Sequence, residues 1–246
     1  MKRYQKILLV LLPLVLGLGI GAFLLSKPSR PRSQAPSESS ASPETPLQSV
    51  RSEVGRKSGP APGEIDLLAR LELSRDAVHG SWGFQGGSLV SPSAQWARLS
   101  IPCIPPEEYD LRIVVTRRQG TDSLNVGFLH GGRQGMLMVD GNGGETSWID
   151  LVTPYDLSSN PTAILGKYLK WNRSTQVLVS VRKNGVGVSV DKTRIIDWTG
   201  EAAELKLIPG YRIPDRQRLF IGAWETVLLI EELTLIPVTG TPLFPQ

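Results

Sequence analysis

The segment from Tyr109 to Asp140 constrains the fold most, because apolar residues occupy every second position in two parts of it. These residues are Leu111, Ile113 and Val115 in the first part, and Leu124, Val126 and Phe128 in the second. Gly120 and the Gly131-Gly132 pair interrupt the pattern. Alternation of this kind is typical of half-buried strands, and glycine favours the turns between them. The segment therefore predicts a meander of three strands onto which further strands pack.

The remainder of the chain after residue 63 has the same character. Further strands are expected at 82–84, 88–90, 97–101, 176–183, 186–190, 195–198, 205–208, 219–223 and 227–237. The Asn184-Gly185 pair is a strong signal for a tight hairpin turn. No long amphipathic helix is visible, and many short strands at this spacing predict an all-β sandwich or barrel. Asp140 is followed by GNGGETSWIDL, and the stretch after that segment is expected to be irregular as far as Asn172.

The first 26 residues have the composition of a membrane anchor. Residues 1–6 are basic, and residues 7–25 form an unbroken apolar run that would span about 28 Å as a helix. The run lacks a good small-residue cleavage site, so we expect a single-pass signal-anchor at 1–26. A cleaved signal peptide is the alternative.

Residues 27–63 are rich in proline, serine and alanine, a composition that cannot form a core and that predicts a disordered linker. The sandwich is expected at 64–240, followed by a C-terminal tail at 241–246. Because such a linker makes most sense if it holds a domain away from a membrane, we expect the domain on the extracytoplasmic side. A disordered cytoplasmic linker is the alternative.

The charge distribution argues against a nucleic-acid partner. The chain carries a net charge of +4. Residues 1–63 hold nine basic and three acidic residues, whereas residues 64–246 hold eighteen basic and twenty acidic ones. The expected domain is therefore slightly acidic and has no overall field that would attract phosphate.

Cys103 is the one cysteine of the chain, so an intramolecular disulfide is excluded. It stands among apolar residues, and the two histidines, His79 and His130, occur in no recognised catalytic motif. We interpret Cys103 as a buried small hydrophobic residue, because a reactive thiol needs an electropositive setting.

Three stretches resemble a known class of domain: Trp82 followed by SLVSP, the hairpin VSVRKNGVGVSVDKTRIIDWTG, and the closing RLFIGAWETVLLIEELTLIPV. They are similar to the concanavalin A-like lectin/glucanase (laminin-G-like) jelly roll. The segment IPCIPPEEYDLRIVVTRRQGTDSLNVGFLHGGRQ resembles membrane-anchored domains of this class from planctomycete-like bacteria. The resemblance covers residues 64–238 and implies a jelly-roll sandwich of two antiparallel sheets. The fold hosts lectins, glycosidases and interaction modules, so the resemblance implies no single activity.

The sequence from Asp140 to Glu145, DGNGGE, could be a calcium loop or a glycine-rich hairpin turn. It lacks the ligand spacing of an EF-hand, so we expect a turn, no metal and no cofactor. Calcium remains the alternative, because laminin-G-like relatives bind it on loops.

The candidate ligand-binding residues follow from the chemistry of sugars, whose apolar C–H faces stack on indole rings while polar side chains bind their hydroxyls. Tryptophans beside acidic, amide or basic residues in the irregular part fit this pattern. The predicted set is Arg133, Asp140, Asn142, Trp148, Asp150, Trp171 and Asn172. Trp82, Trp198 and Trp224 stand in strand-like contexts and are expected in the core.

The function predicted from these observations is a membrane-tethered, extracytoplasmic, non-catalytic module that binds carbohydrate or a protein at the cell surface. One alternative is a glycoside hydrolase-like enzyme of the lectin/glucanase fold, although no pair of acids forms a recognised motif. A structural envelope protein is the second alternative. No catalytic residue is nominated.

Overall fold

The computed structural model describes residues 61–151 and 157–245. The predicted membrane anchor at 1–26, and all but the last residues of the predicted linker, lie outside this part of the chain. Among the described residues, no helix has both the length and the apolar character needed to cross a bilayer.

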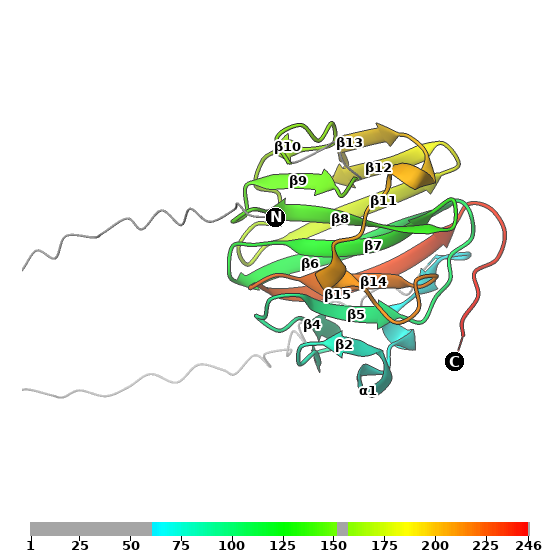
Figure 1. Ribbon diagram of the computed structural model, residues 1–246. Coiled ribbons are helices and arrows are strands. Elements are labelled where there is room, and N and C mark those ends of the chain that lie inside the picture. The colour runs from blue at the N-terminus through cyan, green and yellow to red at the C-terminus, as the bar shows by residue number, and fades with distance from the viewer. Residues whose placement is uncertain (1–60, 152–156, 246) are drawn as a thin grey trace, which may run out of the picture. The chain divides into compact units, whose positions relative to one another are not determined.

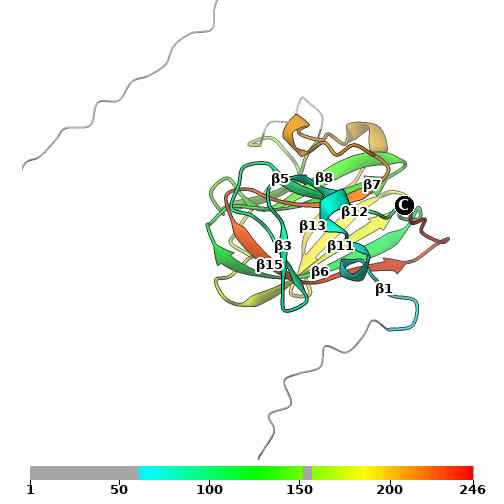
Figure 2. The same cartoon turned by 90° about the horizontal axis from the view of Figure 1, so that it is seen from below.

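Two antiparallel sheets form the described part of the chain, and Figures 1 and 2 show them as two layers. The first sheet has the order β13-β12-β11-β6-β15-β4-β3, with β1 also paired to β15. Its strands are β1 (Ile65–Asp66), β3 (Gly83–Gln85), β4 (Ser88–Val90), β6 (Tyr109–Gln119), β11 (Ser174–Arg182), β12 (Gly185–Val190), β13 (Thr193–Thr199) and β15 (Val227–Pro237). The all-β class with two antiparallel sheets is thereby confirmed.

The second sheet has the order β10-β9-β8-β7-β14-β5-β2. Its strands are β2 (Ala77–His79), β5 (Ala97–Ile101), β7 (Leu124–His130), β8 (Arg133–Gly141), β9 (Thr146–Ile149), β10 (Ile164–Leu165) and β14 (Leu219–Ala223). The described helices are short: α1 (Leu73–Asp76) and the 3-10 turns η1 (Leu68–Arg70), η2 (Ala202–Glu204) and η3 (Pro209–Tyr211).

The three strands predicted between Tyr109 and Asp140 exist, but they do not form one meander. β7 pairs with β8 in the second sheet, whereas β6 pairs with β11 and β15 in the first. The chain passes from one sheet to the other near Gly120. This residue has φ +78°, and a Cβ here would lie 2.3 Å from the carbonyl oxygen of Glu225, so only glycine fits without strain. The alternating apolar residues of β6 and β7 therefore face each other across the core.

The main core lies between the two sheets. Its members alternate along the central strands and are fully or almost fully buried, among them Leu111, Ile113, Val115, Val126, Phe128, Leu137, Val139, Val177, Val179 and Ile221. Strand β15 places four apolar residues in this core, although the buried positions change from even to odd residue numbers along it. The change is possible because the pairing register shifts between Ile230 and Glu232. This bulge lets Leu228 and Ile230 on one side of it, and Leu233 and Leu235 on the other, point inward. Cys103 is fully buried in the same core, as predicted.

Two predictions about local structure were wrong. The segment 205–208 is not a strand of either sheet, although Leu205 makes an isolated bridge to Leu151. It belongs instead to residues 201–218, here called the covering segment, which lies outside the layer that contains β7 and β8 (Figure 2). The stretch after Leu151, expected to be irregular as far as Asn172, contains the short strand β10, which pairs with β9.

Candidate functional site

The outer face of the second sheet carries a second, smaller apolar cluster. Residues on β7 and β8 alternate, so that Leu137 and Val139 enter the main core while Met136 and Met138 point to the other side. Tyr211 and Ile213 of the covering segment, together with Phe220 of β14, pack on these methionines. The central strands of this sheet are therefore covered on both faces.

Side-chain hydrogen bonds fasten the covering segment to the sheet. Asn125 Nδ2 donates to Tyr211 Oη at 2.7 Å, Arg98 Nε donates to the carbonyl oxygen of Arg212 at 2.7 Å, and Gln134 Nε2 donates to that of Arg218 at 2.7 Å. The segment contributes to two pockets. Ile208 and Tyr211 line one of them, and the other is lined by Lys206, Leu207, Arg212, Arg216 and Gln217.

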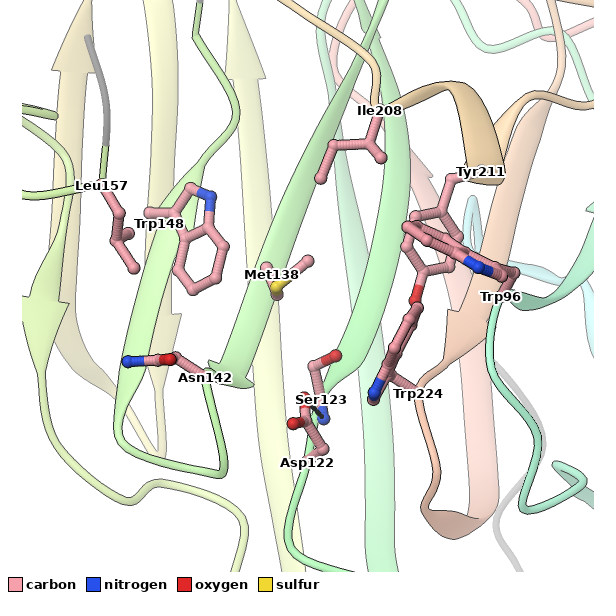
Figure 3. A pocket seen from close by; sticks show the side chains of 10 residues that line it. All are labelled: Trp96, Asp122, Ser123, Met138, Asn142, Trp148, Leu157, Ile208, Tyr211 and Trp224. Atoms are coloured by element: carbon pink, nitrogen blue, oxygen red, sulfur yellow. Dashed lines mark hydrogen bonds between the residues drawn. The ribbon is translucent and has the colours of Figure 1, made fainter. Parts of the chain in front are cut away.

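The first of these, here called the aromatic pocket, has a volume of about 310 Å³. It is lined by Trp96, Asp122, Ser123, Met138, Asn142, Trp148, Leu157, Ile208, Tyr211 and Trp224. Figure 3 shows Trp148 on one side, Trp96 and Trp224 on the opposite side, and Met138 between them. Asp122 and Ser123 lie side by side at the lower end, Asn142 lies at the same end below Trp148, and Ile208 lies at the upper end (Figure 3). The volume is at the lower end of the range for small-ligand sites.

Strand pairing brings two of these tryptophans together. Ala97 of β5 pairs with Ala223 of β14, so that Trp96 and Trp224 flank the paired ends of two antiparallel strands. The Trp96 ring packs edge to face on Trp224 with centroids 4.5 Å apart, and on Tyr211 with centroids 5.3 Å apart. Such contacts restrict the indole planes and leave the rings presented to the pocket.

The backbone at this corner is strained. Trp96 has φ +58° and Glu225 has φ +43°, conformations that cost on the order of 1–3 kcal/mol each for residues other than glycine. Gln95 Nε2 donates to Glu225 Oε1 at 2.7 Å, and the amide of Glu225 donates to the carbonyl oxygen of Ala94 at 3.1 Å. These contacts hold both loops in place. Strain of this kind concentrates at binding and catalytic sites.

Glycines make room for two of the tryptophan rings. A Cβ on Gly210 would lie 2.2 Å from Trp96 Cε3, and a Cβ on Gly141 would lie 2.7 Å from Trp148 Cη2. The indole of Trp96 therefore rests on the covering segment, and that of Trp148 rests on the end of β8. A Cβ at either glycine would therefore force the neighbouring side chains to move.

The polar end of the aromatic pocket is built from two interlocked loops. Asp122 accepts hydrogen bonds from the amide of Ser123 at 2.8 Å and from the amide of Gly143 at 3.0 Å. The second bond fixes the 141–144 turn, in which Asn142 has φ +54° and is exposed. Asp122 is the one acid among the described residues that line this pocket.

Tyr211 and Asn125 connect the pocket wall to the sheet. Burial raises the pKa of the Tyr211 hydroxyl, which stays protonated and also donates to the carbonyl oxygen of Ala223 at 3.4 Å. Asn125 is fully buried, and its Nδ2 also donates to Ser123 Oγ at 3.1 Å. Its Oδ1 has no hydrogen-bond partner in the described part of the chain.

The second pocket, here called the basic pocket, has a volume of about 500 Å³. It is lined by Gly132, Arg133, Gln134, Lys206, Leu207, Arg212, Arg216 and Gln217. Four of these eight residues are cationic and exposed, and no acid lines the pocket within residues 61–151 and 157–245. Gln134 is 6% exposed, and its Oε1 lacks a partner among the described residues.

The structure brings three of the seven predicted ligand-binding residues to these pockets. Asn142 and Trp148 line the aromatic pocket, and Arg133 lines the basic pocket. Trp171 and Asn172 line neither. Trp171 is 56% exposed, and Asn172 accepts a hydrogen bond from Arg118.

Asp140 is a structural residue. Its Oδ2 forms a buried ion pair with Arg117 Nη2 at 3.0 Å, and its two oxygens accept the amides of Tyr168 and Leu169 at 2.8 Å each. Burial raises the pKa of the carboxyl, and these donors oppose that effect. With Arg117 at this position, Asp140 is not placed to bind Ca²⁺, and no group of three acidic, histidine or cysteine residues that could hold a metal occurs in the described ranges. The sequence from Asp140 to Glu145 forms the turn between β8 and β9.

Asp150 lies beneath the covering segment. It is 8% exposed, and burial raises its pKa to about 6, while nearby Lys206 and the amide of Ile208 oppose the shift. Its Oδ2 has no hydrogen-bond partner within the described ranges. Asp150 thus lies under the boundary between the two pockets and lines neither.

The sequence analysis missed most of the aromatic pocket. Trp224, predicted to lie in the core, is partly exposed in the pocket wall, whereas Trp82 and Trp198 are buried as predicted. Trp96 was not nominated. In the sequence, Trp96 directly precedes one predicted strand and Trp224 directly follows another, each beside an alanine. This pattern indicates a shared pocket wall only once it is known that these two strands pair.

No family model matches the chain. No curated protein matches it either. Several solved structures are similar in fold. The carbohydrate-binding module CBM66 from Bacillus subtilis has a TM-score of 0.46 and 10% identity, covering 65% of this chain and 93% of that one. Crh5 transglycosylase has a TM-score of 0.49 and 12% identity, covering 72% and 84%. The Ca²⁺-bound exoplasmic/lumenal domain of VIP36 has a TM-score of 0.45 and 12% identity, covering 66% and 83%.

Proposed function

We propose that this protein is a membrane-tethered, extracytoplasmic, non-catalytic module that binds carbohydrate in the aromatic pocket. The observation that carries the proposal is the placement of Trp148 opposite Trp96 and Trp224, with polar groups at one end of the space between them (Figure 3). A sugar ring has two apolar faces and a rim of hydroxyls. Indoles can stack on the faces. At the rim, Asp122 can accept hydrogen bonds from sugar hydroxyls, and Asn142 can both donate and accept them.

The lining supports binding better than hydrolysis. Glycoside hydrolysis by the usual mechanisms uses two carboxyl groups that flank the scissile bond. Asp122 is the one acid in the described lining, and two backbone amides already bind its oxygens. This arrangement favours a residue that orients a ligand and shapes a loop.

The membrane tether and the extracytoplasmic position are part of the proposal on sequence grounds. The apolar run at residues 7–25 supports a span, and the proline- and serine-rich residues that follow support a linker. A binding domain on such a linker can reach glycans beyond the membrane surface.

The test is a glycan-binding measurement on the full-length chain with three tryptophan variants. Trp148→Ala and Trp224→Ala should each weaken binding by about 1 to 3 kcal/mol, the scale of a well-placed aromatic contact. Trp171→Ala is the matched control, because it removes an indole that is 56% exposed and lines neither pocket. Its affinity should equal that of the wild type.

Thermal unfolding of each variant separates a ligand contact from a packing role. Equal loss of affinity in all three variants, or loss only in proportion to unfolding, would overturn the aromatic pocket as the site. Hydrolysis of the bound glycan by the wild type would replace the binding module with an enzyme.

A further inference from the structure

The basic pocket gathers four cationic side chains in a domain whose net charge is negative. Residues 64–246 carry two more acidic than basic residues. Yet Arg133, Lys206, Arg212 and Arg216 converge on one cavity of about 500 Å³ whose described lining contains no acid. Four like charges around one cavity repel one another, and an anion placed among them would remove that repulsion.

The protein itself neutralises little of this charge. None of the four cations takes part in a salt bridge within residues 61–151 and 157–245, whereas neighbouring Arg218 is paired with Asp215 at 3.2 Å. Asp150 attracts Lys206 electrostatically, but it is buried under the covering segment and does not line the pocket, so it can offset at most one of the four charges. The guanidinium groups therefore remain available, and a guanidinium group can donate two parallel hydrogen bonds to two oxygens of a carboxylate or of a tetrahedral sulfate.

Gln134 adds an observation that points to a sugar-borne anion. Its side chain is 94% buried and lines the pocket, and its Nε2 is engaged by the carbonyl oxygen of Arg218. Its Oε1 has no partner in the described part of the chain. Because a buried acceptor without a donor is costly, a ligand hydroxyl is the natural group to satisfy it. A simple anion such as sulfate has no hydrogen to donate, whereas an acidic sugar carries both an anionic group and hydroxyl donors.

Both pockets lie on the same face of one strand. Gln134 lines the basic pocket and Met138 lines the aromatic pocket, and both point outward from β8 with Met136 between them under the covering segment. Four residues of a strand span about 13 Å. A short oligosaccharide can therefore reach from one pocket to the other by passing over the covering segment.

We propose that the basic pocket binds the carboxylate or sulfate group of an acidic glycan, while the apolar face of a sugar ring of the same glycan stacks on the indoles of the aromatic pocket. This deepens the proposed function by assigning the substrate class, and for the glycan it rests on that function. The four cations supply the charge recognition, and Gln134 Oε1 accepts a hydroxyl of the same sugar.

The test compares matched pairs of probes that differ only in charge. The full-length chain is titrated with oligogalacturonate and its methyl ester, and with a carrageenan oligosaccharide and its desulfated form. At least one acidic member should bind about tenfold or more tightly than its neutral partner, and the pair in which this occurs identifies carboxylate or sulfate. In Arg133→Gln/Arg216→Gln the advantage should disappear while affinity for the neutral member is unchanged.

The control variant removes two charges elsewhere. Lys170→Gln/Lys192→Asn removes exposed cations that line neither pocket, and asparagine suits position 192, where φ is +70°. It should keep the acidic preference. Absence of any preference, or an equal loss in both double variants, would overturn the basic pocket as a specific site.

Equilibrium dialysis of radiolabelled sulfate against the full-length chain separates failure of this inference from failure of the proposed function. If no glycan of either kind binds, the proposed function fails. Sulfate binding that Arg133→Gln/Arg216→Gln abolishes would then still support the anion site, and no sulfate binding would overturn it. If neutral glycans bind and Trp148→Ala weakens them while charge has no effect, the proposed function stands and the anion site falls.

Discussion

Trp96 and Trp224, which are far apart in the sequence, pack edge to face with ring centroids 4.5 Å apart because Ala97 pairs with Ala223 where β5 meets β14. The pair forms one wall of the aromatic pocket, opposite Trp148 (Figure 3). The backbone register of two strands thus places two indoles in one wall of the pocket.

Replacement of Gly210 by alanine should weaken glycan binding. The new Cβ would lie 2.2 Å from Trp96 Cε3, so the indole must shift and the wall that it forms with Trp224 is disturbed. We expect a loss of about 5- to 100-fold in affinity, together with a loss of stability of similar size, about 1 to 3 kcal/mol, from overpacking. Gly83→Ala is the control, because no atom lies within 4 Å of its Cβ position. Unchanged affinity in Gly210→Ala would show that the position of Trp96 is unimportant.

Asp150→Asn should stabilise the protein at neutral pH. The folded-state pKa of Asp150 is raised to about 6 by burial, above the ordinary value of about 3.9. Between these values the folded state binds more protons than the unfolded state, so the free energy of unfolding falls as the pH rises from 4 to 6.

The uncharged asparagine avoids this loss, and we expect a gain of about 1 to 2 kcal/mol at pH 7 and little difference at pH 4. Denaturant unfolding at both pH values measures it. Asp197→Asn, an exposed acid, should show no such dependence. A loss of stability at pH 7 would mean that attraction to Lys206 outweighs the cost of burial.

Asp140→Asn should destabilise the domain strongly. The substitution leaves Arg117, which is 3% exposed, without its ion-pair partner. Breaking one side of a buried pair costs about 3 to 5 kcal/mol, because the remaining charge is desolvated. Glu145→Gln at the other end of the same turn breaks a surface pair with Lys167 at 3.6 Å, and should change the free energy of unfolding by less than about 1 kcal/mol. Similar small effects of both variants would contradict a structural role for Asp140.

Residues 64–246 should fold without the rest of the chain, because the predicted linker shares no hydrophobic pattern with the sandwich. Expressed alone, this fragment should be soluble, give a β-dominated circular dichroism spectrum and unfold cooperatively. Aggregation of the fragment that residues 1–63 prevent, or a helical spectrum, would refute the predicted boundary.

Protease added to intact spheroplasts should remove the sandwich and leave a short N-terminal fragment, since basic residues precede the apolar run at 7–25. An antibody against an N-terminal tag would detect that fragment. A cytoplasmic marker protein should stay intact as the control for membrane integrity. Protection of the sandwich until the membrane is permeabilised would reverse the topology.

Local periodicity was enough to locate many strands. The predicted ranges 88–90, 97–101, 219–223 and 227–237 coincide with β4, β5, β14 and β15. Alternation of apolar residues indicates which side chains of a strand are buried, and it can be read from residues that are close together in the chain. The resemblance to a jelly-roll class added the prediction that the strands form two antiparallel sheets.

The candidate site was predicted only in part, because local sequence patterns do not show which distant residues come together. Trp148 and Asn142 lie in the part of the sequence that was nominated, beside other polar residues. Trp224 looked like a core residue, since a tryptophan next to a strand is usually buried. Nothing in its local sequence reports that the covering segment leaves a pocket beside it.

The sequence by itself therefore determined most of the longer strands, the all-β class and the chemical types available for a site, because these depend on residues close together in the chain. The tertiary structure alone decided that β6 and β7 belong to different sheets, that Trp96 meets Trp224, and that Asp140 is neutralised by Arg117. Each of these depends on strand order and register, which are set by the packing of two whole sheets across a shared core rather than by any single segment.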